Sequence, residues 1–347
     1  MASYVIVGVG ATGLRVARHL RRGADNLALD LFDDDGRRAT QVAQELGGQT
    51  RGFDTTFDPS LINPSSVVVL AGRAGSQIGD ARLCVDAGAH VVAVSDRLDE
   101  VEALLDLDEA AKGKGVRVVV GAGMMPGLSD VLAAHGRRWF DEVSEIHVSK
   151  FGTGGPDCAR QHHSALSRPA LDWRDGWQRR PGGSGRELAW FPEPVEAADC
   201  YRAELPDPLL LVRRHPKVTR VTARMAATRR DRLTMHLPML RRPHPEGLLG
   251  AVRVELRGLS RGAWLDLVLG CSERPAVVAA AVASTAAQLV HPETQGSETL
   301  TPGARGLAEY VDPLSFLRTL RSRGLRQEIF VGPDDGPYGL ELGQMAR

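Results

Sequence analysis

The sequence predicts an α/β protein in which a doubly wound parallel sheet is followed by a second, α+β domain. Three observations lead to this prediction. Valine-rich apolar runs alternate with helix-like segments over the first third of the chain, a glycine-rich turn joins the first run to the first helix, and the pattern changes after a Gly/Pro-rich stretch at residues 121–127. Parallel strands buried on both faces need such apolar runs, and each crossover helix returns the chain across the sheet.

The elements of the first domain follow from the apolar runs and from helical periodicity. Strands are expected at residues 4–7, 27–32, 67–71, 91–95 and 116–120. Helices are expected between them, at residues 13–20, 37–46, 78–87 and 101–111.

The second half differs from the first in composition and in its hydrophobic pattern. Residues 128–139 have a helical pattern, residues 152–216 are rich in Gly, Pro, Arg and Trp, and alternation at 218–225 and 251–257 predicts half-buried strands. Helices at 275–290 and 313–323 and a strand at 328–331 follow, and we expect this tail to pack back on the first domain. The expected domains are 1–127, 128–274 and 275–347.

The composition of the chain argues against several classes of protein. The chain has 347 residues, 43% of them hydrophobic, with 43 basic and 43 acidic side chains, which argues against disorder and against a polybasic nucleic-acid binder. No apolar run approaches the about 20 residues of a membrane span, and the N-terminus lacks signal-peptide features, so we expect a cytoplasmic protein without a membrane partner. Four widely spaced cysteines argue against a disulfide framework.

Charge is concentrated in the middle of the chain. Residues 151–262 carry a net charge of +8, against −5 before them and −3 after them. This basic segment either attracts an anionic substrate or forms a solvated basic surface.

A glycine fingerprint indicates a dinucleotide-binding site. Gly8, Gly10 and Gly13 follow the first expected strand and open the first helix, so they allow a tight turn, close approach of a pyrophosphate and close helix packing. Asp33 ends the second strand, where a carboxylate accepts hydrogen bonds from the adenosine ribose. The other cofactor-binding candidates at the same edge of the sheet are Ala11, Thr12, Asp34, Ala71, Gly72 and Ser95.

The preferred nicotinamide cofactor is NAD, with NADP left open. The carboxylates of residues 33–35 would repel a 2′-phosphate, whereas Arg37 and Arg38 could bind one. Ser95 and Asp96 are expected to line the nicotinamide side, and their alternative role is a helix cap or turn.

Residues 152–163 are the best candidate for substrate chemistry. They bring Cys158, Arg160, His162 and His163 close together after flexible glycines. Either histidine can exchange protons near neutral pH, and Arg160 could hold a carboxylate. Cys158 and the two histidines match no standard zinc spacing, so no metal is expected.

Other candidate residues are more dispersed. Asp96 and Asp130 are lesser candidates for the proton donor. Arg186 and Arg224 are further possible carboxylate binders, for which ordinary ion pairs are the alternative. Trp173, Trp177 and Trp190 are expected to pack in the core or a lid rather than to form a stacking platform, and no aromatic residues are interleaved with basic ones elsewhere, so no nucleic-acid partner is expected.

Three segments together resemble the saccharopine dehydrogenase-like superfamily: the glycine fingerprint, residues 87–95, and the sequence GAGMMPGLSD at 121–130. The resemblance implies a Rossmann domain paired with a mixed-sheet domain that often forms a homodimer contact, and hydride transfer between NAD(P) and a C–N carbon. It adds Pro126 to the cofactor site. In saccharopine reductases proper an acidic residue precedes the Pro-Gly turn and Ile-Asp-His follows it, whereas this chain has Met125 before the turn and Leu-Ser-Asp after it.

The sequence therefore predicts an NAD(P)-dependent oxidoreductase that interconverts an amine and an imine on an amino-acid-like small molecule. His162 or His163 is expected to donate the proton, and Arg160, Arg186 or Arg224 to anchor a carboxylate. The alternatives are oxidative deamination of the lysine 6-dehydrogenase type and a non-catalytic dinucleotide-binding sensor or scaffold.

Overall fold

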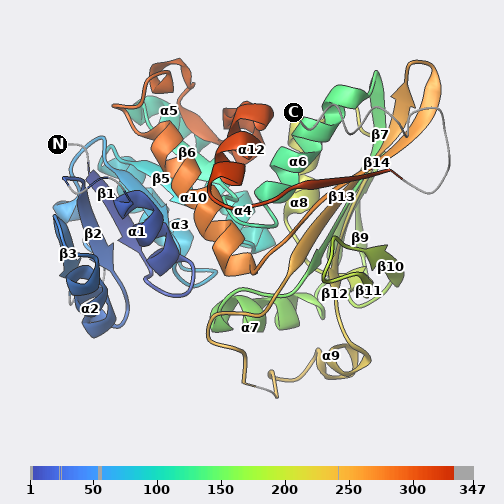
Figure 1. Ribbon diagram of the computed structural model, residues 1–347, viewed down its shortest axis with the longest axis horizontal. Helices are drawn as coiled ribbons and strands as arrows, with labels where there is room; N and C mark the ends of the chain where they lie inside the picture. The colour runs from blue at the N-terminus through green and yellow to red at the C-terminus, as the bar shows by residue number, and fades with distance from the viewer. Residues whose placement is uncertain (1–2, 23, 25, 54–56, 241, 332–347) are drawn as a thin grey trace.

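The computed structural model describes residues 3–22, 24, 26–53, 57–240 and 242–331, which form two β-sheets with helices between and beside them (Figure 1). The first sheet has seven strands in the order β15-β6-β5-β4-β1-β2-β3. Every neighbouring pair in it is parallel. This is the predicted doubly wound Rossmann-type sheet.

The strands of the first sheet form because short runs such as VVVL are apolar on both faces. The strands are β1 (Ser3–Val7), β2 (Ala28–Phe32), β3 (Thr50–Phe53), β4 (Val67–Leu70), β5 (His90–Ala93), β6 (Arg117–Val120) and β15 (Gly303–Gly306). The helices associated with them are α1 (Gly13–Arg21), α2 (Gly36–Leu46), α3 (Gln77–Asp86), α4 (Leu98–Leu105), α5 (Asp108–Lys114), α10 (Pro275–Val290), α11 (Leu307–Tyr310) and α12 (Pro313–Ser322).

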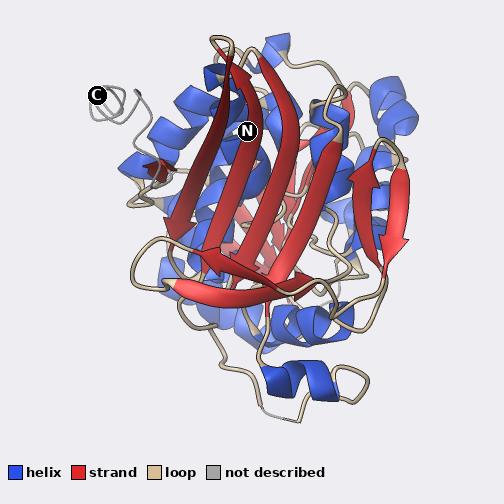
Figure 2. Cartoon of the chain, turned by 90° about the vertical axis from the view of Figure 1, so that its right-hand side faces the viewer, coloured by secondary structure: helices blue, strands red, loops and turns tan. Residues whose placement is uncertain are grey.

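The second sheet is mixed, as expected for an α+β domain. Its main path runs β10-β11-β12-β7-β13-β14-β16, with β8 and β9 attached beside β12. Only β12 and β7 pair in parallel among these neighbours. Figure 2 shows the long central strands of this sheet face-on.

The elements of the second half are these: α6 (Leu128–Gly136), β7 (Glu142–Phe151), α7 (Pro156–Ala165), β8 (Ala170–Arg174), β9 (Trp177–Arg180), β10 (Glu187–Trp190), β11 (Ala197–Arg202), α8 (Asp207–Arg214), β12 (Arg220–Ala226), α9 (Arg229–Thr234), β13 (Ala251–Ser260), β14 (Ala263–Ser272) and β16 (Glu328–Val331). Among the helices of the described residues, none is long and apolar enough to cross a membrane.

The core has two main parts. Helices α3, α4 and α5 pack on one face of the first sheet around residues such as Val68 and Leu104. The other face packs on α10, and the same apolar cluster continues through α6 to the second sheet, where Ile146 and Val254 belong to it. The two sheets are therefore joined through a shared hydrophobic layer rather than by a linker alone.

The structure refines the expected elements in several places. The helix expected at 101–111 is two helices, α4 and α5, with a break between them. Strand β3 lies at the sheet edge with the partly exposed sequence TRGF, so its apolar signal is weak. The segment after residue 275 serves both halves, because β15 pairs with β6 of the first sheet and β16 pairs with β14 of the second.

Candidate active site

The glycine turn after β1 forms an open cradle. Gly8 has φ of +91°, and a Cβ on it would lie 2.5 Å from the backbone nitrogen of Gly72. A Cβ on Gly13 would lie 1.9 Å from the carbonyl oxygen of Gly8, whereas a Cβ on Gly10 would meet nothing within 4 Å. The turn is thus closed on the protein side and open at Gly10, which fits the close approach of a pyrophosphate.

Asp33 is held at the rim of this cradle. Its carboxylate accepts hydrogen bonds from the backbone amides of Val9, at 2.6 Å, and Asp35, at 2.9 Å. The side chain is 8% exposed. These two bonds orient the carboxylate and leave acceptor capacity for a ribose.

Basic side chains at this edge lie beside carboxylates, among them Arg38, one of the two arginines expected to bind a 2′-phosphate. Arg38 lies 3.5 Å from an oxygen of Asp33, and the exposed Arg73 lies 3.7 Å from one of Asp34. Arg37 is exposed on α2. The positive charge at this rim is therefore partly compensated by the neighbouring aspartates.

Two expected cofactor residues make mainly structural contacts. The Ser95 hydroxyl donates to the buried Glu100, which also accepts from the backbone amides of Gly75 and Gln77 at the start of α3. Ser95 is thus part of the helix-cap arrangement considered as its alternative. The backbone amide of Ala71 donates to the carbonyl of Val7, so it holds two strand ends together.

Three other expected cofactor residues lie at turns of this edge. Thr12 is the N-cap of α1 without a side-chain capping bond, and Ala11 lies next to it in the glycine turn. Pro126 is buried and follows a cis peptide bond from Met125.

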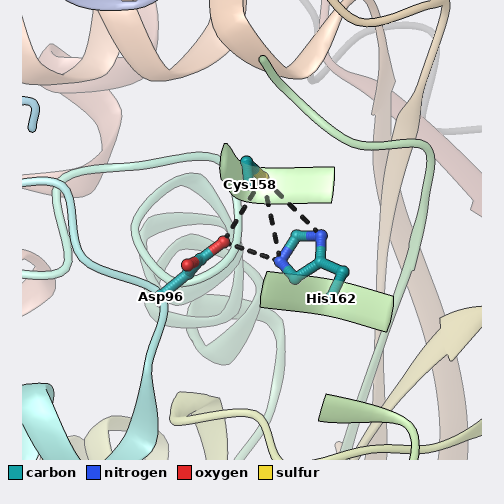
Figure 3. A group of neighbouring side chains, drawn as sticks. All are labelled: Asp96, Cys158 and His162. Atoms are coloured by element: carbon teal, nitrogen blue, oxygen red, sulfur yellow. Dashed lines mark hydrogen bonds and ion pairs between the residues drawn. The ribbon is translucent and has the colours of Figure 1, made fainter. Parts of the chain in front are cut away.

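A cluster of three reactive side chains lies near this edge (Figure 3). Asp96 follows β5, while Cys158 and His162 lie one turn apart on α7 and share a face of that helix. The Asp96 Oδ2 atom lies 2.6 Å from His162 Nε2, and the Cys158 sulfur lies 3.6 Å from both Asp96 Oδ2 and His162 Nδ1. The structure thus brings three residues singled out from the sequence into direct contact.

Lys150 is a fourth member that the sequence analysis did not find. Its Nζ atom lies 3.1 Å from His162 Nε2, and the residue is only 3% exposed. Lysine is rare in this chain, with four among 43 basic residues, and a lysine within an alternating apolar stretch is the signal that could have found it. A buried lysine normally needs a charged or hydrogen-bonding partner.

Charge in the cluster favours a protonated histidine and an ionised aspartate. Burial by itself would lower the pKa of His162, but the charges of Cys158 and Asp96 outweigh it and raise the pKa to about 9. Burial would raise the pKa of Asp96, yet His162 and Lys150 bring it down to about 2. At neutral pH the pair is therefore an imidazolium and a carboxylate.

The donor atoms of Asp96, Cys158 and His162 are near enough to one another to consider a metal. The Lys150 ammonium beside the imidazole opposes a second cation there, and the 2.6 Å contact between Asp96 and His162 is that of a hydrogen-bonded ion pair. The chemistry of this set suits proton transfer better than metal binding.

The two adjacent histidines have different surroundings. His163 Nε2 lies 3.1 Å from the carbonyl oxygen of Thr234 and 3.0 Å from that of Leu237, so it joins α7 to the end of α9 and the residues just after it. His162 points into the cluster instead. Neighbouring positions of a helix point about 100° apart, which explains the divergence.

Asp130 lies in a second acidic group behind the cluster. It is 2% exposed, and its neighbour Ser129 donates a 2.7 Å hydrogen bond to Asp207, which is completely buried. Burial and then the charge of Asp207 raise the pKa of Asp130 well above its usual value. Burial likewise raises the pKa of Asp207 to about 6, although Ser129 and Lys150 oppose the increase.

Each of the three candidate anchoring arginines is paired with a carboxylate of this chain. Arg160 lies 2.6 Å from Asp157, and Arg186 lies 2.9 Å from Asp199. The buried Arg224 lies 3.0 Å from Glu187 and also donates to Thr222. A substrate carboxylate would have to compete with these partners.

Two solved structures share this architecture over nearly the whole chain. Saccharopine dehydrogenase (L-Glu forming) from Saccharomyces cerevisiae matches with a TM-score of 0.68 and 12% identity, covering 95% of this chain and 100% of that chain. Homospermidine synthase from Legionella pneumophila, solved in complex with NAD, matches with a TM-score of 0.68 and 13% identity, covering 96% of this chain and 93% of that chain. The chain has the saccharopine dehydrogenase fold.

The resemblance drawn from the sequence motifs is therefore confirmed at the level of the fold. No protein-family model matches the sequence. Since fold alone does not fix function, the activity has to be argued from the cradle and the cluster.

Proposed function

We propose that the protein is an NAD(P)-dependent oxidoreductase that interconverts an amine and an imine on an amino-acid-like substrate. One observation carries the proposal: the start of α7 lies against the glycine turn. A Cβ on Gly155 would lie 3.3 Å from the Cβ of Ala11, and Cys158 begins the reactive cluster three residues later. The same short segment therefore connects a dinucleotide cradle to a proton-transfer cluster.

The chain offers a defined set of groups for the cofactor. Gly8, Gly10 and Gly13 would hold the pyrophosphate at the N-terminus of α1, and Asp33 would accept from the adenosine ribose. When bound, the nicotinamide would supply or take up the hydride. The carboxylates around Arg38 and Arg73 favour NAD over NADP, because they also repel a 2′-phosphate.

The protein itself would supply the proton. Reduction of an imine needs a proton at nitrogen, and His162 holds one at neutral pH because its pKa is about 9. Asp96 fixes the ring through the Nε2 contact and stabilises the imidazolium. His162 is 1% exposed, whereas Asp96 and Cys158 are only partly buried and form the outer edge of the cluster.

The test begins with cofactor binding. Fluorescence titration with NADH and with NADPH would compare the wild type, Asp33→Ala and the matched control Asp35→Ala, whose exposed carboxylate lies beside Arg38 of α2. Loss of the Asp33 acceptor should weaken binding by about tenfold or more, because a lost hydrogen bond to a charged group costs about 1.5–3 kcal/mol. Failure of the wild type to bind either nucleotide would refute the proposal.

Substrate class is tested next with imines formed from keto acids or aldehydes and amino acids. Consumption of the reduced cofactor, with one secondary amine formed for each cofactor oxidised, is the expected result. An ammonia assay in the oxidative direction separates deamination, which releases ammonia, from oxidative cleavage of a secondary amine, which releases one amine and one carbonyl compound. A protein that binds cofactor but turns over no member of the panel would instead be a sensor or scaffold.

A further inference from the structure

Glu100 is a buried carboxylate that joins two loops at the carboxyl edge of the first sheet. It lies in the first turn of α4 and is 3% exposed. Its Oε1 atom accepts hydrogen bonds from the backbone amides of Gln77, at 2.7 Å, and Ile78, at 3.2 Å. Its Oε2 atom accepts from the Gly75 amide at 2.8 Å and from the hydroxyl of Ser95, which follows β5. The carboxylate thus holds the start of α3 and the end of β5 together.

The contact with Ser95 goes beyond what a helix cap requires. The hydrogen bonds to backbone amides are those of a cap for α3, whereas Ser95 belongs to the end of another strand. A buried carboxylate is costly unless it is hydrogen-bonded, and here neutral donors stabilise it. Of the charged side chains that interact with it electrostatically, Arg97 forms an ion pair with Asp99, and Asp80 of α3 carries the same sign. The burial of a charge beside Asp96 therefore indicates a role beyond capping.

Asp96 lies between two residues that this arrangement holds in place. The Ser95 hydroxyl also accepts a 3.4 Å hydrogen bond from the backbone amide of Arg97. Arg97 has extended backbone angles, and a Cβ on Gly75 would lie 2.6 Å from its Nη1 atom, so its guanidinium lies against the loop before α3. Neighbouring side chains of an extended segment point to opposite sides. Ser95 and Arg97 therefore face the start of α3, while Asp96 faces α7 and contacts the imidazole of the cluster.

The loop before α3 also reaches the glycine turn. A Cβ on Gly8 would lie 2.5 Å from the backbone nitrogen of Gly72, so the two backbones are in close contact. The side chain of Gln77 donates to the carbonyl of Gly72 at 3.3 Å, while its backbone amide is bound to Glu100. Glu100 therefore connects the cofactor cradle with the proton-transfer cluster through a continuous set of hydrogen bonds and packing contacts.

We propose that Glu100 is a positioning residue which, by fixing Ser95, holds Asp96 in contact with His162. The role rests on the proposed function, in which His162 donates the proton to the substrate nitrogen. Glu100 itself touches neither substrate nor cofactor in this role and acts on the reaction only through Asp96. Loss of its bond to Ser95 would release the turn that carries Asp96 and would weaken the 2.6 Å contact with the imidazole.

NMR titration of protein labelled with ¹⁵N at histidine tests this role without any turnover. Ser95→Ala removes one hydroxyl and no charge, and it leaves the backbone amides bound to Glu100. Burial and the charges of Cys158 and Lys150 still act on His162, so the weaker Asp96 contact should lower its titration midpoint by about one pH unit or more from about 9. An unchanged midpoint in Ser95→Ala would overturn the role.

The matched control for Ser95→Ala is Ser76→Ala. It removes an exposed hydroxyl at the N-cap of α3, which donates to the carbonyl of Arg73, and it leaves the contacts of Glu100 in place. The His162 midpoint should stay at about 9 in this variant. An equal decrease in both serine variants would mean that any disturbance of the α3 start has this effect, and it would also overturn the role.

Glu100→Gln shows whether the effect passes through Asp96. The variant keeps the size of the side chain, turns an amide nitrogen toward one pair of donors and removes a negative charge, and the lost charge also lowers the His162 midpoint directly. The decrease caused by Glu100→Gln should therefore be much smaller in an Asp96→Asn background than in the wild type. Equal decreases in the two backgrounds would leave only the direct charge effect and would contradict positioning. If Glu100→Gln does not fold, Ser95→Ala decides the question.

Kinetics separate positioning from a purely structural cap. In Ser95→Ala, kcat for imine reduction should fall by about tenfold or more, and its decrease with rising pH should move to lower pH together with the NMR midpoint of His162. A cap alone would lower Tm and leave the pH profile of kcat unchanged, which would overturn the positioning role. If the wild type binds cofactor but never turns over, the proposed function fails, while the NMR titrations still decide whether Glu100 positions Asp96.

Discussion

Asp96 Oδ2 lies 2.6 Å from His162 Nε2, so a residue at the end of β5 and a residue on α7 form one ion pair across the two halves of the molecule. Asp96 comes from the sheet edge that carries the glycine turn, and His162 comes from the helix that begins beside that turn. The pair therefore places a proton donor at the edge of the sheet where doubly wound folds bind their ligands.

Removal of the imidazole tests this assignment. His162→Gln should lower kcat by about 100-fold, because it removes the proton donor, while NADH affinity stays near the wild-type value. The control is His163→Gln, which breaks contacts to the carbonyls of Thr234 and Leu237 and should lower stability by about 1 kcal/mol with a much smaller effect on kcat. Equal losses of kcat in both variants would remove His162 from the mechanism.

The pH dependence follows from the raised pKa of His162. In the reductive direction kcat should fall as pH rises through about 9, because the imidazolium is lost. The stability of the folded protein should change with pH in the same direction. The contribution of His162 to that stability is complete below its ordinary pKa of 6.5 and is lost as pH rises through about 9. Asp96→Asn should move the kcat decrease to lower pH, and Asp99→Asn, outside the cluster, should leave it in place.

Lys150 also affects the pKa of His162, in the direction opposite to that of Asp96. Its charge lowers the pKa of His162, so Lys150→Met should raise that pKa above about 9. NMR titration of protein labelled with ¹⁵N at histidine would measure the change directly. The matched control is Lys217→Met, which removes an exposed lysine and should leave the His162 resonance unaffected. A downward change in Lys150→Met would mean that the lysine does not face the imidazole.

The glycine cradle can be divided into a structural and a ligand-facing part. Gly13→Ala should destabilise the fold by about 1–3 kcal/mol, because the new methyl group would clash with the Gly8 carbonyl. Gly10→Ala should keep the wild-type Tm, since its methyl group meets no protein atom, and should weaken NADH binding by about tenfold or more. Thermal unfolding and fluorescence titration of both variants check the pair of expectations. Wild-type affinity in a folded Gly10→Ala protein would place the cofactor elsewhere.

The sequence by itself determined the doubly wound sheet and the cradle. Apolar runs such as VVVL at β4 and the glycines at 8, 10 and 13 act through burial and backbone geometry over a few neighbouring residues, so their pattern is readable without the fold. The same holds for α10, whose expected bounds at 275–290 match the structure because proline begins it and its interior is almost wholly apolar.

Only the tertiary structure decided which candidate side chains meet. Nothing local distinguishes His162 from His163, and the difference arises because α7 directs one toward Asp96 and the other toward carbonyls at and just after the end of α9. Lys150 joins the cluster through the path of β7, and the segment after residue 275 reaches both sheets through pairing with distant strands. Such contacts depend on how elements far apart in the sequence pack together. The helix and strand propensities of neighbouring residues do not predict that packing.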